Sequence, residues 1–240
     1  MTRRRPGIGA LVCAWTGGAA FVASLLVFLY LYGITYGRAS ARPSGPAIAV
    51  DILLFSLFAL HHSLLARAGL KRRVTELVPI WLERSVFTWT ASGLFVIVCV
   101  SWQPVDGLLY SLAGPWRVAG YTTQAAGLLM ILVGASGIDV LALAGVRQVL
   151  DARSGKAPAQ MALKTDGAYG LVRHPLYSGW TLFVLGAPDM TGTRAVFAAV
   201  STLYLAIAIP FEERSLVDLF GDAYRRYQRV TRWRMLPGIW

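Results

Sequence analysis

Residues 8–37 read IGALVCAWTGGAAFVASLLVFLYLYGITYG, a run of 30 residues without a charged side chain. A helix needs about 20 mainly apolar residues to cross the hydrocarbon core of a membrane. The apolar part of a secretory signal peptide covers only about 7–15 residues, so this run is too long for one. We therefore expect Arg3, Arg4 and Arg5 to flank a retained first membrane span over residues 8–36.

Five further apolar runs follow along the chain. Three predict membrane spans, at residues 46–66, 86–102 and 118–143, and two shorter runs cover residues 175–188 and 195–211. The run 175–188 would reach roughly 21 Å as a helix, short of a core about 30 Å thick. It could extend to Met190 or tilt, but we expect it to form a short hairpin with the last run, with its tip at residues 189–193.

The composition agrees with lipid as the solvent. Hydrophobic residues make up 56% of the chain and charged residues 15%, whereas soluble domains carry about a quarter charged residues. The net charge of +11 sits in short basic clusters between apolar runs, a pattern typical of membrane topology rather than of nucleic-acid binding. Cys13 and Cys99 lie inside apolar runs, and their spacing indicates no metal site.

Lysine and arginine residues also predict the orientation. With the N-terminus in the cytoplasm, 19 of the 23 fall on the inner side. The sequence therefore predicts an all-α integral membrane protein of six transmembrane segments in a bacterial inner membrane, with both termini cytoplasmic.

The tail, residues 212–230, predicts a C-terminal amphipathic helix. Leu216, Phe220, Tyr224 and Tyr227 recur at steps of three or four, which places them on one helix face. Such a helix could pack on the bundle or lie on an anionic leaflet, and the alternative is a solvated basic tail.

Polar residues concentrate on the predicted cytoplasmic side, although they come from separate segments. Ionisable groups are costly near a bilayer and are commonly functional or paired, so we expect one shared site. Its candidates are His61, His62, Gln148, Lys164, Asp166, Tyr169, Arg173, His174, Tyr177, Glu212 and Glu213.

Residues 167–179, GAYGLVRHPLYSG, predict the start of a helix at Pro175, because proline suits a first helical turn. Arg173 and His174 would then stand at the helix entrance, where negative groups are favoured. A cofactor carboxylate could dock there. Alternatively, Arg173 binds a lipid phosphate and His174 caps the helix.

The adjacent acids Glu212 and Glu213 would point about 100° apart on a helix of 3.6 residues per turn. They should therefore have different partners. One could hold a cation or hydroxyl groups and the other an arginine such as Arg173. The alternative is an ordinary acid stabilised by the helix dipole.

These motifs, together with the later residues Phe220, Gly221, Tyr224 and Tyr227, resemble the isoprenylcysteine carboxyl methyltransferase family over about residues 161–230. The resemblance implies S-adenosyl-L-methionine bound at the cytoplasmic membrane boundary. Carried over by position, its cofactor-binding residues are Met161, Ala162, Leu163, Lys164, Tyr169, His174, Pro175, Leu176, Tyr177 and Glu212.

One position departs from that family. Its prenylcysteine enzymes carry an arginine one helical turn before the acidic pair, and Ala208 stands there in this chain. Alanine cannot hold a substrate carboxylate, which disfavours methylation of a prenylcysteine.

The N-terminal half resembles the bacterial methanethiol S-methyltransferase and NnrU-like group, through His61-His62-Ser63 and Trp81-Leu82-Glu83-Arg84-Ser85. This resemblance covers most of the chain. It implies one membrane methyltransferase domain, residues 1–240, with a four-span part, 1–144, and a cofactor-binding catalytic part, 145–240.

The implied reaction is S-methylation of a small or lipophilic thiol such as methanethiol. A thiol reacts as its thiolate, which Arg173 or His62 could favour, and Glu213 is the predicted substrate-binding residue. His62 could equally be a packing residue. The alternatives are a prenylcysteine carboxylate or a lipid amine as acceptor, or a non-enzymatic NnrU-like membrane protein. We expect membrane lipid as a partner and no metal.

Overall fold

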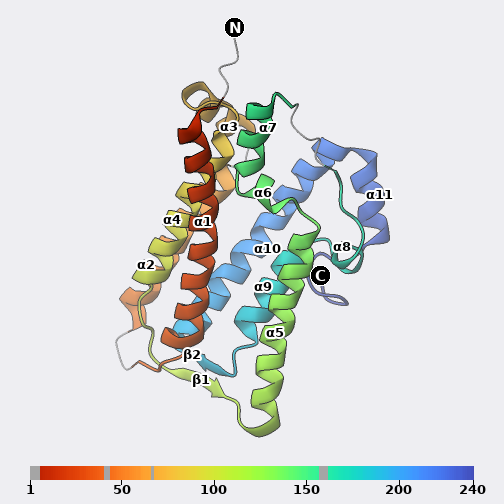
Figure 1. Ribbon diagram of the computed structural model, residues 1–240. Helices are drawn as coiled ribbons and strands as arrows, with labels where there is room; N and C mark the ends of the chain where they lie inside the picture. The colour runs from red at the N-terminus through yellow and green to blue at the C-terminus, as the bar shows by residue number, and fades with distance from the viewer. Residues whose placement is uncertain (1–5, 41–43, 66–67, 157–161) are drawn as a thin grey trace. The chain divides into compact units, whose positions relative to one another are not determined.

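A computed structural model describes residues 6–40, 44–65, 68–156 and 162–240 (Figure 1). These residues fall into two compact units, and each is described by itself. The first comprises the described residues of 1–35, 53–102 and 139–161, and the second those of 36–52, 103–138 and 162–240.

Five helices of the described chain are long and apolar enough to cross a membrane. They carry many large apolar side chains that the rest of the described chain leaves exposed, among them Leu26, Leu53, Val100, Leu132 and Leu203. Lipid is the natural solvent for such surfaces, so the chain is an all-α integral membrane protein. The five are α1 (Ile8–Tyr30, continued by a π-helical turn, Leu31–Thr35), α2 (Ser44–Leu65), α4 (Glu83–Ser101), α5 (Gly114–Ser136) and α10 (Gly192–Phe220).

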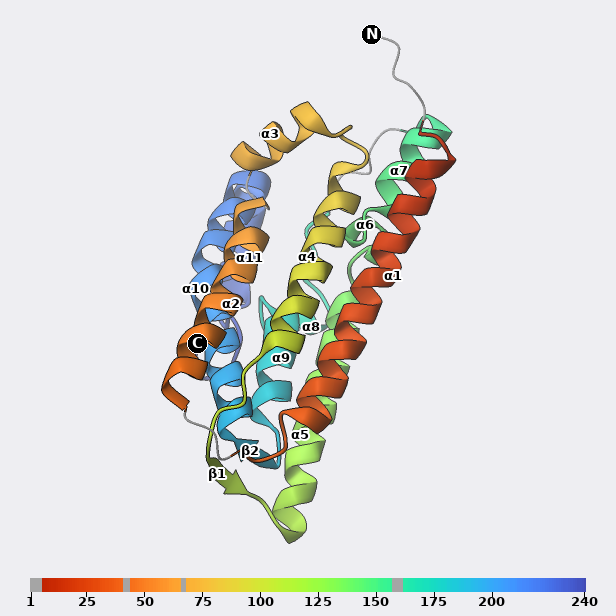
Figure 2. The same cartoon turned by 90° about the vertical axis from the view of Figure 1, so that its left-hand side faces the viewer.

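In the first unit, α1 lies along α4 (Figure 2), and Trp89 Nε1 donates a hydrogen bond of 3.0 Å to the Cys13 carbonyl. This unit also contains residues 53–65 of α2 and the helices α3 (Ala68–Leu77), α6 (Val140–Leu143) and α7 (Val146–Ser154). A buried apolar cluster of Ala14, Ala144, Val146 and Val149 joins α7 to α1.

The start of α4 holds the turn between α6 and α7. Arg84 Nε donates to the Leu143 carbonyl at 2.8 Å, and Ser85 Oγ donates to the Gly145 carbonyl at 3.0 Å. Gly145 has φ of +86°, and a Cβ there would lie 2.4 Å from the Ser85 nitrogen. Only glycine fits both the left-handed backbone and this close approach.

In the second unit, a two-stranded antiparallel ribbon of β1 (Leu108–Ser111) and β2 (Asp189–Thr191) pairs Leu108 with Thr191. The sequence did not predict this ribbon. Because β1 leads into α5 and β2 leads into α10, both helices begin at the same end of the unit (Figure 1). The predicted hairpin tip is thus the second strand of the ribbon.

The short helix α9 (Pro175–Leu185) packs against α5 through glycines. Gly120, Gly127 and Gly134 recur at steps of seven and are the buried residues of α5. A Cβ on Gly127 would lie 2.6 Å from the Gly179 carbonyl oxygen, and one on Gly179 would lie 2.5 Å from the Gly127 carbonyl oxygen. The two backbones therefore touch, an approach common between membrane helices that meet at small residues.

Three predicted boundaries were wrong. The span 118–143 ends at Ser136, and the apolar residues beyond it form the separate turn α6. The helix in the run 175–188 ends at Leu185. The last run and the start of the tail form one helix of 29 residues, α10, which continues through Pro210 to Phe220. The amphipathic tail helix is only α11 (Asp222–Val230), because Gly221, with φ of +55°, interrupts the helix before it.

Candidate functional site

The candidate site lies at the first turn of α9. His174 is the N-cap residue and Pro175 begins the helix, as the sequence predicts. A helix leaves its first amides without acceptors inside the helix. In α9 these belong to Leu176 and Tyr177, since Pro175 has no N–H.

Glu212 of α10 faces this turn. The Tyr177 hydroxyl donates a hydrogen bond of 2.8 Å to Glu212 Oε2, and His174 Nδ1 lies 3.7 Å from the same oxygen. The His174 and Tyr177 rings are stacked, with centroids 5.4 Å apart and planes 9° apart. The Glu212 side chain remains 42% exposed. The site therefore offers a carboxylate with room for a further ligand beside two aromatic rings.

Glu213 points the other way and is buried, with its side chain 6% exposed. Its Oε1 accepts from Arg173 Nε at 2.6 Å and lies 3.4 Å from His174 Nε2. Its Oε2 accepts from Gln228 Nε2 at 3.3 Å and lies 3.4 Å from Arg234 Nε. The two acids thus have different partners, and Arg173 is one of them, as their angular separation predicts.

Tyr169 belongs to α8 (Ala168–Leu171) and is held by α11. The Tyr227 hydroxyl donates to the Tyr169 carbonyl at 2.7 Å. Burial raises the pKa of the Tyr169 phenol, and the nearby Glu212 carboxylate raises that pKa further. Burial also raises the pKa values of Tyr224 and Tyr227, so all three phenols are neutral near pH 7.

The remaining predicted residues belong to other segments or fall outside the described chain. Met161 is outside the described residues. Ala162, Leu163 and Lys164 precede α8, and Lys164 Nζ pairs with Asp166 at 2.9 Å. His62 belongs to the first unit, where its ring packs against those of Phe58 and Phe87.

Sequence reasoning missed the role of the C-terminal segment, residues 231–235. Its backbone is bound by Arg173, His174 and Ser178. Backbone carbonyls exist at every residue, so no side-chain pattern in the sequence marked this segment.

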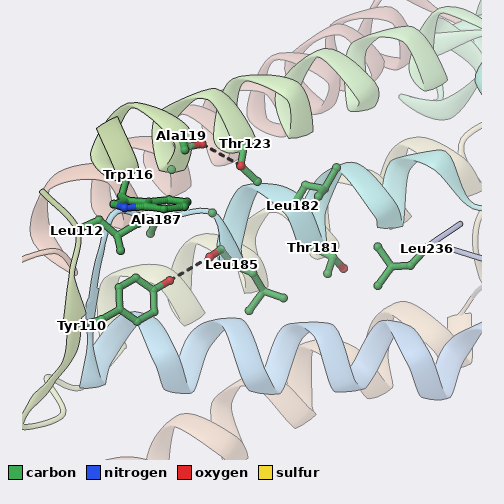
Figure 3. A pocket seen from close by; sticks show the side chains of 12 residues that line it. Tyr110, Leu112, Trp116, Ala119, Thr123, Thr181, Leu182, Leu185, Ala187 and Leu236 are labelled. Atoms are coloured by element: carbon green, nitrogen blue, oxygen red, sulfur yellow. Dashed lines mark hydrogen bonds between the residues drawn. The ribbon is translucent and has the colours of Figure 1, made fainter. Parts of the chain in front are cut away.

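Two cavities of the second unit lie near α9. One of about 400 Å³ lies at the ribbon end, where Trp116, Leu182 and Leu185 line it and Tyr110 donates to the Leu185 carbonyl at 3.2 Å (Figure 3). The other, of about 600 Å³, is lined by residues 170–172, Ser178 and residues 230–233 and 235–237. Neither is lined by Glu212 or Tyr177, so the polar cluster rather than a cavity marks the candidate site.

The fold defines an integral membrane protein, and comparison with known proteins shows that it is a methyltransferase and specifies its family. The chain is 36% identical over 222 residues to the methanethiol S-methyltransferase of Pseudomonas sp. (strain GM41(2012)), covering 85% of this chain and 82% of that protein. It is 32% identical over 222 residues to the methanethiol S-methyltransferase of Mycobacterium tuberculosis, covering 89% and 91%. The chain belongs to the methanethiol S-methyltransferase family.

A shorter match links it to a second group. It is 37% identical over 70 residues to the protein-S-isoprenylcysteine O-methyltransferase of Schizosaccharomyces pombe, which covers 28% of this chain and 30% of that protein. No protein-family model matches the chain. No solved structure matches it either.

Proposed function

We propose that this chain transfers a methyl group from S-adenosyl-L-methionine to a small or lipophilic thiol such as methanethiol. The observation that carries the proposal is the meeting of Tyr177, His174 and half-exposed Glu212 at the first turn of α9. The relatives named methanethiol S-methyltransferase support the choice of acceptor.

The residues present fit the proposed cofactor, which carries a carboxylate, ribose hydroxyls and a sulfonium cation. Glu212 can accept from hydroxyls or lie beside the cation, and the stacked rings of His174 and Tyr177 offer an aromatic face to it. The first amides of α9, at Leu176 and Tyr177, suit a carboxylate. When bound, the cofactor supplies an electrophilic methyl group. We place Met161, Ala162, Leu163, Lys164, Tyr169 and Pro175 around it as further contacts.

The chain would act mainly by binding and orientation, because a thiolate placed in line with an electrophilic methyl group needs little further help. Arg173 is already occupied by Glu213 and two backbone carbonyls, which favours a structural role over a direct one. A role of His62 in favouring the thiolate stays a prediction. Substrate binding by Glu213 also stays a prediction, and its four protein partners favour a positioning role instead.

The acceptor is proposed to lack a carboxylate. Ala208 lies on α10 one helical turn before Glu212, where its methyl group can bind no anion. The match to the isoprenylcysteine enzyme favours carboxyl O-methylation as the second candidate. A lipid amine is a third acceptor to test.

We also propose six passages through a bacterial inner membrane, with both termini cytoplasmic. Since α5 and α10 begin at the same ribbon, the chain must return between them, and α9 makes part of that return. With 11 residues α9 reaches only about 16 Å, so residues 186–191, which lead into and form the second ribbon strand, would complete the passage. The inner side would hold 19 of the 23 basic residues.

Purified protein tests the proposal with methyl-labelled S-adenosyl-L-methionine. With methanethiol we expect labelled dimethyl sulfide, and with a prenylcysteine or a lipid amine we expect no labelled product. Turnover of the prenylcysteine alone would establish the second candidate. Failure with every thiol would overturn the proposed substrate class.

A further inference from the structure

Arg173 is enclosed by protein, with its side chain 7% exposed. Its Nε donates to Glu213 Oε1 at 2.6 Å, and its Nη1 donates to the carbonyls of Thr231 and Arg232, both at 2.7 Å. The planar guanidinium thus links α10 to the C-terminal segment, and a buried charge needs such partners to be tolerated. With these contacts the Arg173 guanidinium is better placed to hold the C-terminal segment than to bind a thiolate.

The same turn also binds the rest of the segment. The Arg173 and His174 amides donate to the Trp233 and Arg234 carbonyls, both at 2.9 Å. Ser178 Oγ donates to the Met235 carbonyl at 2.6 Å. Five consecutive carbonyls, those of residues 231–235, therefore accept hydrogen bonds from Arg173, His174 and Ser178 at the start of α9. We name this set of contacts the tail clasp.

The clasp meets the candidate site through two shared residues. His174 gives its amide to the clasp, while its ring lies 3.7 Å from Glu212 through Nδ1 and 3.4 Å from Glu213 through Nε2. Glu213 anchors Arg173 and is the chain neighbour of Glu212. A shift of the clasped segment would therefore move the His174 ring and the α10 backbone beside Glu212.

The geometry points to Arg173 as a positioning residue: with Glu213 and Ser178 it fastens residues 231–235 and so holds His174 and Glu212 in the arrangement that binds the cofactor. The inference rests on the proposed function. It assigns residues 231–235 to the cofactor site without giving any of them a contact to the substrate.

Two variants test the inference at different strengths. Arg173→Lys keeps the charge but loses the fork that reaches Glu213 and the carbonyls together, so lysine cannot replace it. Ser178→Ala removes only the hydroxyl, which lies 2.6 Å from the Met235 carbonyl and 3.0 Å from the His174 carbonyl, and should fold. We expect KM for S-adenosyl-L-methionine to rise roughly tenfold or more in the first and roughly threefold to tenfold in the second. KM for methanethiol and the pH profile of kcat should stay within twofold of the wild-type values.

A matched control is Ser201→Ala, since Ser201 is a serine of the same unit with the same 1% exposure and accepts from Trp180 Nε1 at 3.0 Å. It should lower thermal stability about as much as Ser178→Ala but leave KM for the cofactor unchanged. Hydrogen exchange supplies a direct readout, because the amides of Arg173 and His174 should exchange faster in Ser178→Ala alone.

The outcomes are separable. Wild-type protein without affinity for S-adenosyl-L-methionine would refute the proposed function itself. If wild-type protein binds the cofactor and Ser178→Ala binds it equally well, the tail clasp has no positioning role. A shifted pH profile of kcat and a raised KM for methanethiol in Arg173→Lys would instead make Arg173 a residue that meets the thiol.

Discussion

The starts of α4 and α9 each use an arginine and a serine to hold the backbone of a distant segment. At α4, Arg84 and Ser85 bind the carbonyls of Leu143 and Gly145. At α9, Arg173 and Ser178 bind carbonyls of the C-terminal segment. At α9 the Glu213 carboxylate also accepts a hydrogen bond from Arg173, and this acid links the anchor to His174 and Glu212. One anchor therefore fixes a turn, whereas the other is part of a site.

The largest effect should come from breaking the charged anchor. Glu213→Ala would leave the Arg173 guanidinium buried without its carboxylate, and such losses cost about 3–5 kcal/mol of stability. Thermal unfolding in detergent should show the loss. Glu212→Ala is the matched control on the same helix, since a half-exposed acid should change stability little. Equal melting temperatures for the two variants would contradict the division between a buried and a functional glutamate.

The second-largest effect should come from Glu212, the exposed acid of the pair, and it should appear in catalysis rather than in stability. Glu212→Gln should lower kcat/KM for the cofactor by roughly 10- to 100-fold, because a hydrogen bond to a charged group contributes about 1.5–3 kcal/mol. Calorimetry with S-adenosyl-L-methionine and steady-state rates measure it. Asp218→Asn changes an exposed acid of α10 and should leave both unchanged. Retained cofactor affinity in Glu212→Gln would remove Glu212 from the site.

One glycine on α9 and one on α4 test how closely each helix approaches its neighbours. Gly179→Ala on α9 would place a Cβ 2.5 Å from the Gly127 carbonyl oxygen, and such overpacking costs about 1–3 kcal/mol. Gly93→Ala on α4 meets no atom within 4 Å and should gain up to about 1 kcal/mol, since alanine favours helix. The two melting temperatures should therefore move in opposite directions. A stabilised Gly179→Ala would show that α5 and α9 do not meet backbone to backbone.

The smallest effect should come from the serine of the α4 anchor. Ser85→Ala removes one buried hydrogen bond and should cost about 1 kcal/mol of stability, with KM for S-adenosyl-L-methionine unchanged. Thr90→Ala on the same helix is its control, because that hydroxyl bonds only within α4. A raised KM in Ser85→Ala would mean that the α4 anchor also serves the site.

Much of the membrane architecture was predictable from apolar run length. The first three spans match α1, α2 and α4 within a few residues, because lipid-facing helices must satisfy their own backbone hydrogen bonds over the core thickness. The errors lie where apolar residues continue past a helix end, as after Ser136, or where a helix continues past the apolar run, as beyond Phe211. Hydropathy reports the solvent of a residue and not the hydrogen bonds that end a helix.

The candidate site was likewise predictable only in part. The sequence indicated that Arg173, His174, Tyr177 and the acidic pair belong together, and the structure brings them together. It could not show which acid is buried, because a rotation of 100° distinguishes them only once α9 and α10 are packed. The glycines of α5 were overlooked as well, since their meaning depends on how close the neighbouring backbone of α9 comes.

The sequence by itself determined the solvent of this protein, its long helices and the residue types of its site, because these depend on local apolar length and on the chemistry of single side chains. The tertiary structure alone decided the ribbon of β1 and β2, the contact of α5 with α9, and the partners of the Arg173 side chain, which lie 40 to 59 positions away along the chain. Burial and hydrogen bonding arise from distances between segments, and those distances exist only after the helices have packed.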